Sequence, residues 1–156
     1  MALDVPAYGQ EYGWTCLPAC IRMVLAYHGK THREAEIAEA CSTVPLRGTK
    51  PENAVEGVQK LGYRALWFEN ADLKRLEILI GQKWPVIVFL RANDLPHGRR
   101  GLHCVVLIGI ESQRVLMLDP ALDTQISMAA QEFSDAWQAL DNQGMVIWME
   151  GQGQTR

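Results

Sequence analysis

Residues 10–20, Gln10-Glu-Tyr-Gly-Trp-Thr-Cys-Leu-Pro-Ala-Cys20, open a long apolar segment that ends at Gly29. Thr15 suits the N-cap position of a helix, and Gly29 suits the position just beyond its last turn. This spacing predicts a helix over residues 16–28. Because Arg22 is the main charged residue within it, we expect the helix to be buried on most sides.

Cys16 is expected at the N-terminal end of this helix. There the helix dipole and the unpaired N–H groups favour a thiolate over a thiol, which makes the sulfur a nucleophile. A structural cysteine can occupy the same position. A catalytic cysteine therefore requires a base supplied by another part of the chain.

The composition is that of an ordinary globular protein, with 156 residues, 48% of them hydrophobic and 21% charged. We expect one domain over residues 1–156, with its core at residues 8–150. The net charge of −3 provides no basic surface for nucleic acid, and no apolar stretch is long enough to span a membrane. No signal peptide is evident, so we expect a cytoplasmic protein with free thiols, or one exported by a route independent of a signal peptide.

Helical patterns fill the first part of the chain and strand patterns the rest. Thr31 with Glu34, and Thr49 with Glu52, have the spacing of capping boxes and predict two further helices, the second ending at Gly62. Strands are predicted at residues 63–68, 85–90, 103–110, 114–119, 124–128 and 145–150, with helices at 71–80 and 129–140. This order predicts an α+β fold with an N-terminal helical half packed on a C-terminal antiparallel sheet.

A histidine and an aspartate lie at matching ends of the predicted hairpin. His103 begins one strand and Asp119 ends the next, so antiparallel pairing brings both to the same edge of the sheet. If the helix that begins at Cys16 packs on that edge, thiol, imidazole and carboxylate align as a nucleophile, a base and an orienting group. Gln10 lies a short distance upstream and, with the backbone N–H of Cys16, can donate to an oxyanion.

Together these residues resemble the peptidase C39 family of papain-like cysteine peptidases. The shared features are Gln10, Cys16 before an apolar helix, His103 at the start of His-Cys-Val-Val-Leu-Ile-Gly, and Asp119 before a proline. The resemblance covers residues 8–150. It implies a papain-like fold and peptide-bond hydrolysis by a Cys-His-Asp triad with a glutamine oxyanion hole, without a metal or an organic cofactor. A leader or secreted peptide would be the substrate, and an exporter or secretion system the partner.

The sequence departs from the family pattern in two respects. Leu17 follows the cysteine where glycine is usual; we assign Leu17 and Trp14 to the substrate cleft, the alternative being packing against the core or the helix. The best-known members are exporter domains that cut leader peptides after a Gly-Gly pair, whereas this chain contains neither transmembrane helices nor a Gly-x-x-x-x-Gly-Lys loop. Arg99 and Arg100, in a predicted loop at residues 91–101, are candidates for contact with an acidic substrate or partner.

Other interpretations remain open at this point. The same triad can serve an amidase, a deamidase or an acyltransferase that acts on cell-wall peptide or a host protein. Papain-like domains also serve as non-catalytic peptide-docking modules, which typically lack the nucleophile that Cys16 provides here. A metal site formed by Cys16, Cys20, His103 and Cys104 does not match common zinc spacing, and we expect Cys20, Cys41 and Cys104 to pack in the core.

Overall fold

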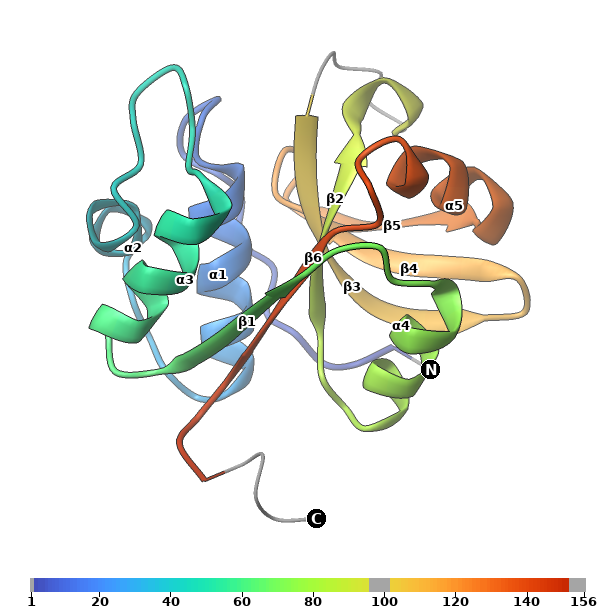
Figure 1. Cartoon of the computed structure of the whole chain (residues 1–156), viewed down its shortest axis with the longest axis horizontal. Coiled ribbons are helices and arrows are strands. Elements are labelled where there is room, and N and C mark those ends of the chain that lie inside the picture. Colours follow the sequence, from blue (N-terminus) through green and yellow to red (C-terminus); the bar gives the residue numbers. More distant parts are fainter. Residues whose placement is uncertain (1, 96–101, 152–156) are drawn as a thin grey trace.

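The computed structural model describes residues 2–95 and 102–151 (Figure 1). Within them the chain forms five α-helices, one short 3-10 helix and six strands. Their bounds are α1 Cys16–Tyr27, α2 Glu34–Ala40, α3 Pro51–Lys60, β1 Arg64–Phe68, α4 Leu73–Gly81, β2 Val86–Arg91, η1 Ala92–Asp94, β3 Leu102–Glu111, β4 Arg114–Asp119, β5 Thr124–Ala129, α5 Ala130–Gln138 and β6 Gly144–Trp148. The predicted order of a helical part followed by a sheet is confirmed.

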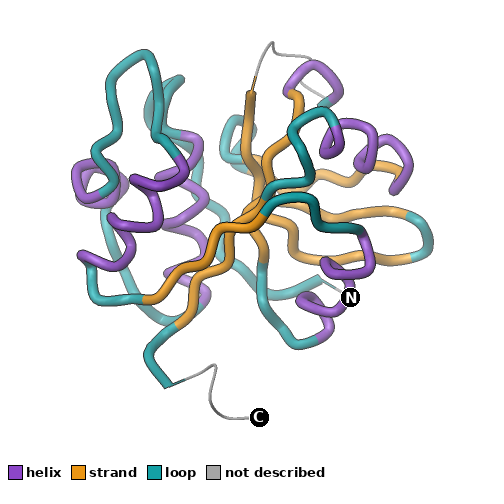
Figure 2. Tube along the Cα trace, viewed as in Figure 1, coloured by secondary structure: helices purple, strands orange, loops and turns teal. Residues whose placement is uncertain are grey.

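The strands form one antiparallel sheet in the order β1-β6-β2-β3-β4-β5. Helices α1 and α3 contact it from one side, at β3 and β1, whereas α4 and α5 pack on the other (Figure 2). Alternate residues of β2 and β3 therefore enter two different cores. Phe89 and Val106 pack with α1, while Val88 and Val105 pack with α4 and α5. Burial on both faces explains why these strands are continuous apolar runs.

Helix α1 is the buried helix that the apolar segment predicts. Cys20, Ile21 and Leu25 have no exposed surface. The guanidinium of Arg22 lies 4.0 Å from the centre of the Tyr8 ring, which shields the one charge on the helix. The helix ends where expected, because the residue after its C-cap is Gly29, with φ of +80°.

Thr15 is the N-cap residue of α1, as predicted, although its side chain makes no capping bond, and the capping boxes predicted at Thr31 and Thr49 are wrong. Helices α1, α2 and α3 begin without a side-chain cap, so neither Thr31 nor Thr49 serves this role. The Thr49 hydroxyl instead bonds that of Thr43 at 2.6 Å. The Thr15 hydroxyl bonds the backbone of Tyr12, accepting from its N–H at 3.1 Å. Thr15 and Thr49 therefore bond residues of the adjoining loops and do not cap the helices that follow them.

The predicted loop at residues 91–101 is only partly described. Its first part extends β2 and forms η1, which corrects the prediction of irregular structure there. Arg99 and Arg100 lie outside the described residues. No helix in the described part of the chain combines the length and apolarity that crossing a membrane requires.

Candidate active site

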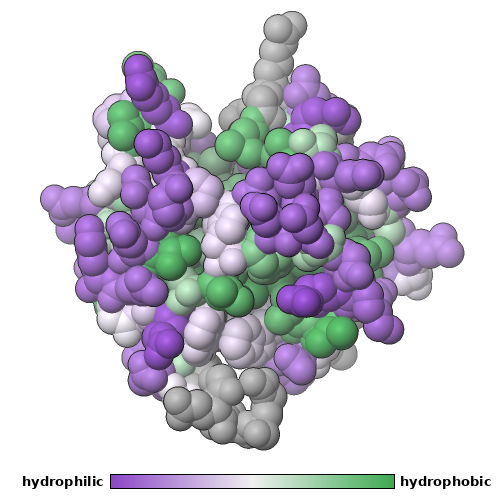
Figure 3. All heavy atoms as spheres, viewed as in Figure 1, coloured by the Kyte–Doolittle hydropathy of each residue, from purple (hydrophilic) through white to green (hydrophobic). Residues whose placement is uncertain are grey.

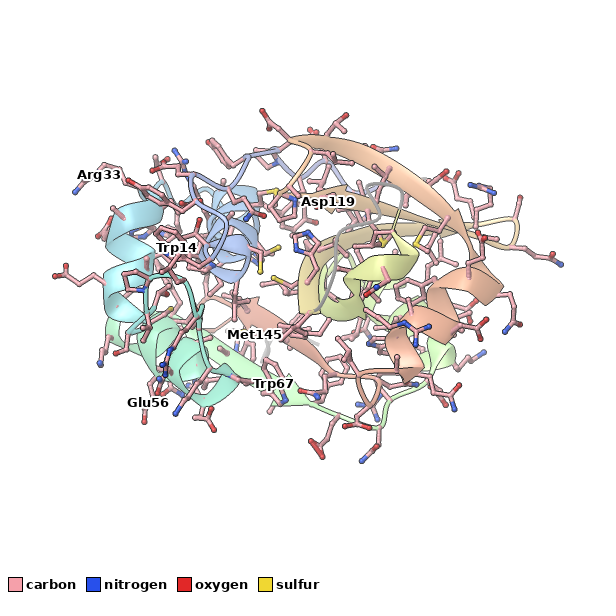
Figure 4. The ribbon with its side chains drawn as sticks, turned by 90° about the horizontal axis from the view of Figure 1, so that it is seen from above. Trp14, Arg33, Glu56, Trp67, Asp119 and Met145 are labelled. Carbon is pink, nitrogen blue, oxygen red and sulfur yellow. The ribbon has the colours of Figure 1, made fainter. Side chains whose placement is uncertain are left out.

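Cys16, His103 and Asp119 meet where the start of α1 faces the sheet. Cys16 is the first residue of α1, and α1 contacts β3, in which His103 is the second residue. Asp119 ends β4, the strand paired with β3. Figure 4 shows Asp119 on the side of the sheet that faces α1. The antiparallel register thus brings the histidine and the aspartate to one edge, as the sequence predicts.

Asp119 holds the imidazole of His103 in a fixed orientation. The distance from His103 Nε2 to Asp119 Oδ1 is 2.7 Å, and the Asp119 side chain is fully buried. The same oxygen accepts the backbone N–H of Ala121 at 2.9 Å, which fixes the carboxylate in turn. Since Asp119 occupies Nε2, the ring presents Nδ1 to Cys16, whose side chain is its other hydrogen-bonding partner.

The pKa of His103 is raised by this arrangement. Burial alone lowers it, but the hydrogen bonds with Asp119 and Cys16, and the negative charges of both groups, outweigh burial and raise the pKa from 6.5 to about 9. The imidazolium is therefore the stable form at neutral pH. A stable imidazolium can neutralise a thiolate beside it.

The Cys16 thiol has a second neighbour that the sequence argument did not include. A hydrogen bond with Cys104, burial and the charge of Cys104 raise the pKa of Cys16 well above its ordinary value, while His103 lowers it. The helix N-terminus is therefore not the main influence on the pKa of this thiol. Cys104 follows His103 on β3, and no local pattern connects it to Cys16.

Replacing Cys104 with alanine is expected to lower the pKa of Cys16, because it removes the neighbour that raises this pKa most. Alkylation of Cys16 by iodoacetamide, followed by intact mass, should then extend to lower pH than in the wild type. Cys41→Ala is the matched control, since Cys41 is another buried thiol and its sulfur lies 3.8 Å from the carbonyl oxygen of Ala54. An unchanged pH profile in Cys104→Ala would contradict the interaction between the two thiols.

A cavity of about 430 Å³ opens beside Cys16 and His103. Trp14 and Leu17, the residues that the sequence assigns to the cleft, both line it. Leu17 is buried and also belongs to the core of α1. Figure 3 shows apolar groups on both walls of the notch at the top of the face viewed there. The apolar lining of the cavity suits a peptide side chain.

Several residues that line the cavity were missed by the sequence analysis. They are Leu46, Arg47, Gly48, Thr49, Phe89 and Leu102. Most belong to the loop between α2 and α3, which Val44 and Gly48 close with two backbone hydrogen bonds of 2.9 and 2.8 Å. Gly48 has φ of +92°, the left-handed region that favours glycine. The glycine at position 48 indicates a turn in the sequence, but no local pattern indicates that this turn lies beside Cys16.

Gln10 lies next to the cavity without lining it. Its backbone N–H donates to the Pro120 carbonyl at 2.9 Å, directly after Asp119. Its side-chain amide donates to the Tyr12 carbonyl at 2.7 Å, which uses one of the two N–H bonds of that group. The structure therefore ties Gln10 to the turn that follows Asp119.

The described residues contain no group of three or more His, Cys, Asp or Glu side chains arranged to hold a metal ion. Of the four residues that the sequence analysis weighed as a metal site, Cys16 interacts with His103 and Cys104, and Cys20 with Cys104.

Comparison with solved structures shows the same fold in several peptidase domains. The peptidase domain of Streptococcus ComA, a bifunctional ABC transporter involved in quorum sensing, is 20% identical with a TM-score of 0.77, over 94% of this chain and 100% of that one. A double glycine motif protease from an AMS/PCAT transporter, solved with its leader peptide, is 21% identical with a TM-score of 0.75, over 95% and 94% of the two chains. A proposed C39-like peptidase from Bacillus anthracis is 19% identical with a TM-score of 0.75, over 92% and 94%.

No curated protein matches this chain. The sequence model of the Peptidase_C39 like family matches residues 2–145. Because this match spans most of the chain and the fold is that of C39 peptidase domains, the protein belongs to the Peptidase_C39 like family.

Proposed function

We propose that this protein is a cysteine peptidase that hydrolyses a peptide bond through Cys16, His103 and Asp119. The observation that carries the proposal is the meeting of a thiol and an imidazole at one cavity, with the imidazole bonded to a buried carboxylate at 2.7 Å. A nucleophile, a base and a group that orients the base are the parts that acyl transfer by a thiol requires.

In the proposed reaction Cys16 attacks the scissile carbonyl carbon as a thiolate, paired with the protonated imidazole of His103. The amide N–H of Gln10 and the backbone N–H of Cys16, unpaired at the helix start, stabilise the resulting oxyanion. The C–N bond then breaks as His103 gives its proton to the leaving amine. In the second half His103 takes a proton from water, and the hydroxide displaces the sulfur and releases the acid.

The proposed substrate is a leader peptide or another secreted peptide. One structural neighbour carries a leader peptide, and two belong to transporters, which supports peptide processing linked to export. The cavity beside Cys16 has apolar walls formed in part by Trp14 and Leu17, which suits a peptide in extended form. An exporter or secretion system is the partner that we propose to supply the substrate.

Alkylation by limiting iodoacetamide between pH 5 and 9 tests the activated thiol, comparing wild type with His103→Ala by intact mass. We expect labelling of one site, Cys16, and slower labelling at neutral pH in the variant, because the imidazolium no longer stabilises the thiolate. Equal labelling of the two proteins would contradict the Cys16–His103 pair.

A second measurement separates the proposed peptidase from the other interpretations. Synthetic leader peptides are incubated with the wild type, with and without an added amine acceptor, and the products are identified by mass. Hydrolysis at an internal peptide bond supports the proposal. Loss of a side-chain amide, or transfer to the amine, indicates a deamidase or a transferase. Binding without any product indicates a docking module.

A further inference from the structure

Four polar or charged residues are buried in the described part of the chain: Thr15, Glu34, His103 and Asp119. His103 and Asp119 belong to the site described above. Glu34 is 2% exposed and lies on α2, outside that site. A carboxylate removed from water is costly unless it is bonded, so its partners indicate why it is there.

The partners of Glu34 are in the segment that leads to Cys16. Both of its oxygens accept the backbone N–H of Glu11, Oε1 at 3.2 Å and Oε2 at 3.0 Å. The Thr15 hydroxyl lies near enough to the carboxylate to oppose the rise in its pKa that burial causes. This hydroxyl accepts the backbone N–H of Tyr12 at 3.1 Å and donates to the Tyr12 carbonyl at 3.0 Å. Glu34 thus holds the start of residues 11–15, and Thr15 closes the segment onto Tyr12.

The same segment is also attached, through Gln10, to the turn that follows Asp119. The N–H of Gln10 donates to the Pro120 carbonyl, and the Gln10 amide donates to the carbonyl of Tyr12. In Figure 4, α2 with Arg33 lies on one side of α1 and Asp119 lies on the other. Residues 10–15 therefore cross the start of α1 between two anchors, the carboxylate of Glu34 and the turn after Asp119.

We propose that Glu34 is a positioning residue, whose buried carboxylate holds residues 10–15 so that the Gln10 amide faces the oxyanion formed at Cys16. This inference rests on the function proposed above. Hydrogen bonds to a charged acceptor are stronger than those between neutral groups, and a carboxylate in the first turn of a helix is further stabilised by the helix dipole. Loss of the acceptor leaves the N–H of Glu11 unpaired in a partly buried site and releases the segment.

The test compares Glu34→Met with Glu34→Gln. The two side chains have similar volume, but only glutamine provides an acceptor for the Glu11 N–H. Glu39→Gln is the control, because Glu39 is an exposed residue of the same helix. Amide hydrogen exchange at residues 10–15 should rise at least tenfold in Glu34→Met and remain near wild type in the other two variants. Exchange at residues 10–15 that stays at the wild-type level in folded Glu34→Met would overturn the proposal.

Activity separates positioning of the oxyanion segment from a general structural role. We expect Glu34→Met to lower kcat for peptide cleavage about 10- to 100-fold with little change in KM, and Glu34→Gln to stay within about threefold of wild type. Alkylation of Cys16 by iodoacetamide should be unchanged in both, because this displacement forms no oxyanion. Equal losses of alkylation and turnover would show that Glu34 acts through the whole fold instead.

Two further outcomes are decided by the same measurements. If Glu34→Met does not fold, Glu34→Asp takes its place, because the shorter side chain withdraws the carboxylate from the Glu11 N–H; exchange at residues 10–15 that stays at the wild-type level in this folded variant overturns the proposal. If the wild type cleaves no peptide, the proposed function fails, while the exchange data still decide whether Glu34 holds residues 10–15.

Discussion

Replacing Cys16 with alanine is expected to abolish peptide cleavage, lowering kcat/KM by a factor of about 10⁴ or more. No other thiol can take its place, because Cys20, Cys41 and Cys104 are fully buried whereas Cys16 is partly exposed in the cavity. Serine at this position is expected to be nearly as inactive, because a hydroxyl is a far weaker acid than a thiol and forms no stable anion beside the imidazolium. The measurement is the initial rate of cleavage of a peptide that the wild type processes.

Cys20→Ala is the matched control for this prediction. Cys20 lies one turn further along α1 and points into the core, so its replacement should cost stability but leave kcat/KM within a few-fold of wild type. Peptide binding should survive in Cys16→Ala, since the walls of the cavity are unchanged. Full activity of Cys16→Ala would refute the mechanism, and equal losses in both variants would point to unfolding rather than chemistry.

Replacing Asp119 with asparagine is expected to lower kcat by about 10²- to 10⁴-fold and to move the titration of His103 to lower pH. The carboxylate fixes Nε2 of the ring and helps to hold the pKa of His103 at about 9. Without the charge of Asp119, Cys16 is the main group that still raises the pKa of His103 against the effect of burial. The pKa of His103 should therefore fall toward its ordinary value of 6.5. The pKa is followed through the imidazole proton resonances by NMR, and kcat through peptide cleavage.

The pH dependence of stability provides a second readout of Asp119. The pKa of His103 is raised in the folded state, from 6.5 to about 9. The contribution of His103 to the free energy of unfolding is therefore complete below pH 6.5 and is lost as pH rises through 9. The free energy of unfolding of the wild type should therefore fall by roughly 3 kcal/mol over this window from this group. Urea unfolding between pH 6 and 9.5 measures the change, which should be much smaller in Asp119→Asn.

Asp123→Asn serves as the control, because Asp123 is an exposed carboxylate in the same turn. It has φ of +54°, a conformation that asparagine also tolerates, so the backbone should be preserved. We expect this variant to retain both the wild-type kcat and the wild-type pH dependence. A shift of the His103 titration in Asp123→Asn equal to that in Asp119→Asn would contradict the assignment of Asp119.

The sequence alone determined the fold class and predicted which residues the fold brings together at the candidate site. Apolar periodicity, turn residues and strand length are local properties, and they predicted the five α-helices and six strands of the described chain, but not the 3-10 helix η1. The pairing of His103 with Asp119 also followed from local information, because a two-residue turn fixes which ends of a hairpin lie together. Both residues of that turn, Ser112 and Gln113, have positive φ, as such a turn requires.

Only the tertiary structure decided how the site is completed. Cys104 raises the pKa of Cys16, Gly48 closes a loop that lines the cavity, and Glu34 bonds Glu11 where its spacing predicted a helix cap. Each of these contacts joins residues far apart in the chain, and their geometry is set by how α1, α2 and the sheet pack. A local pattern cannot specify such contacts, because the same side chain has several possible partners and burial selects among them.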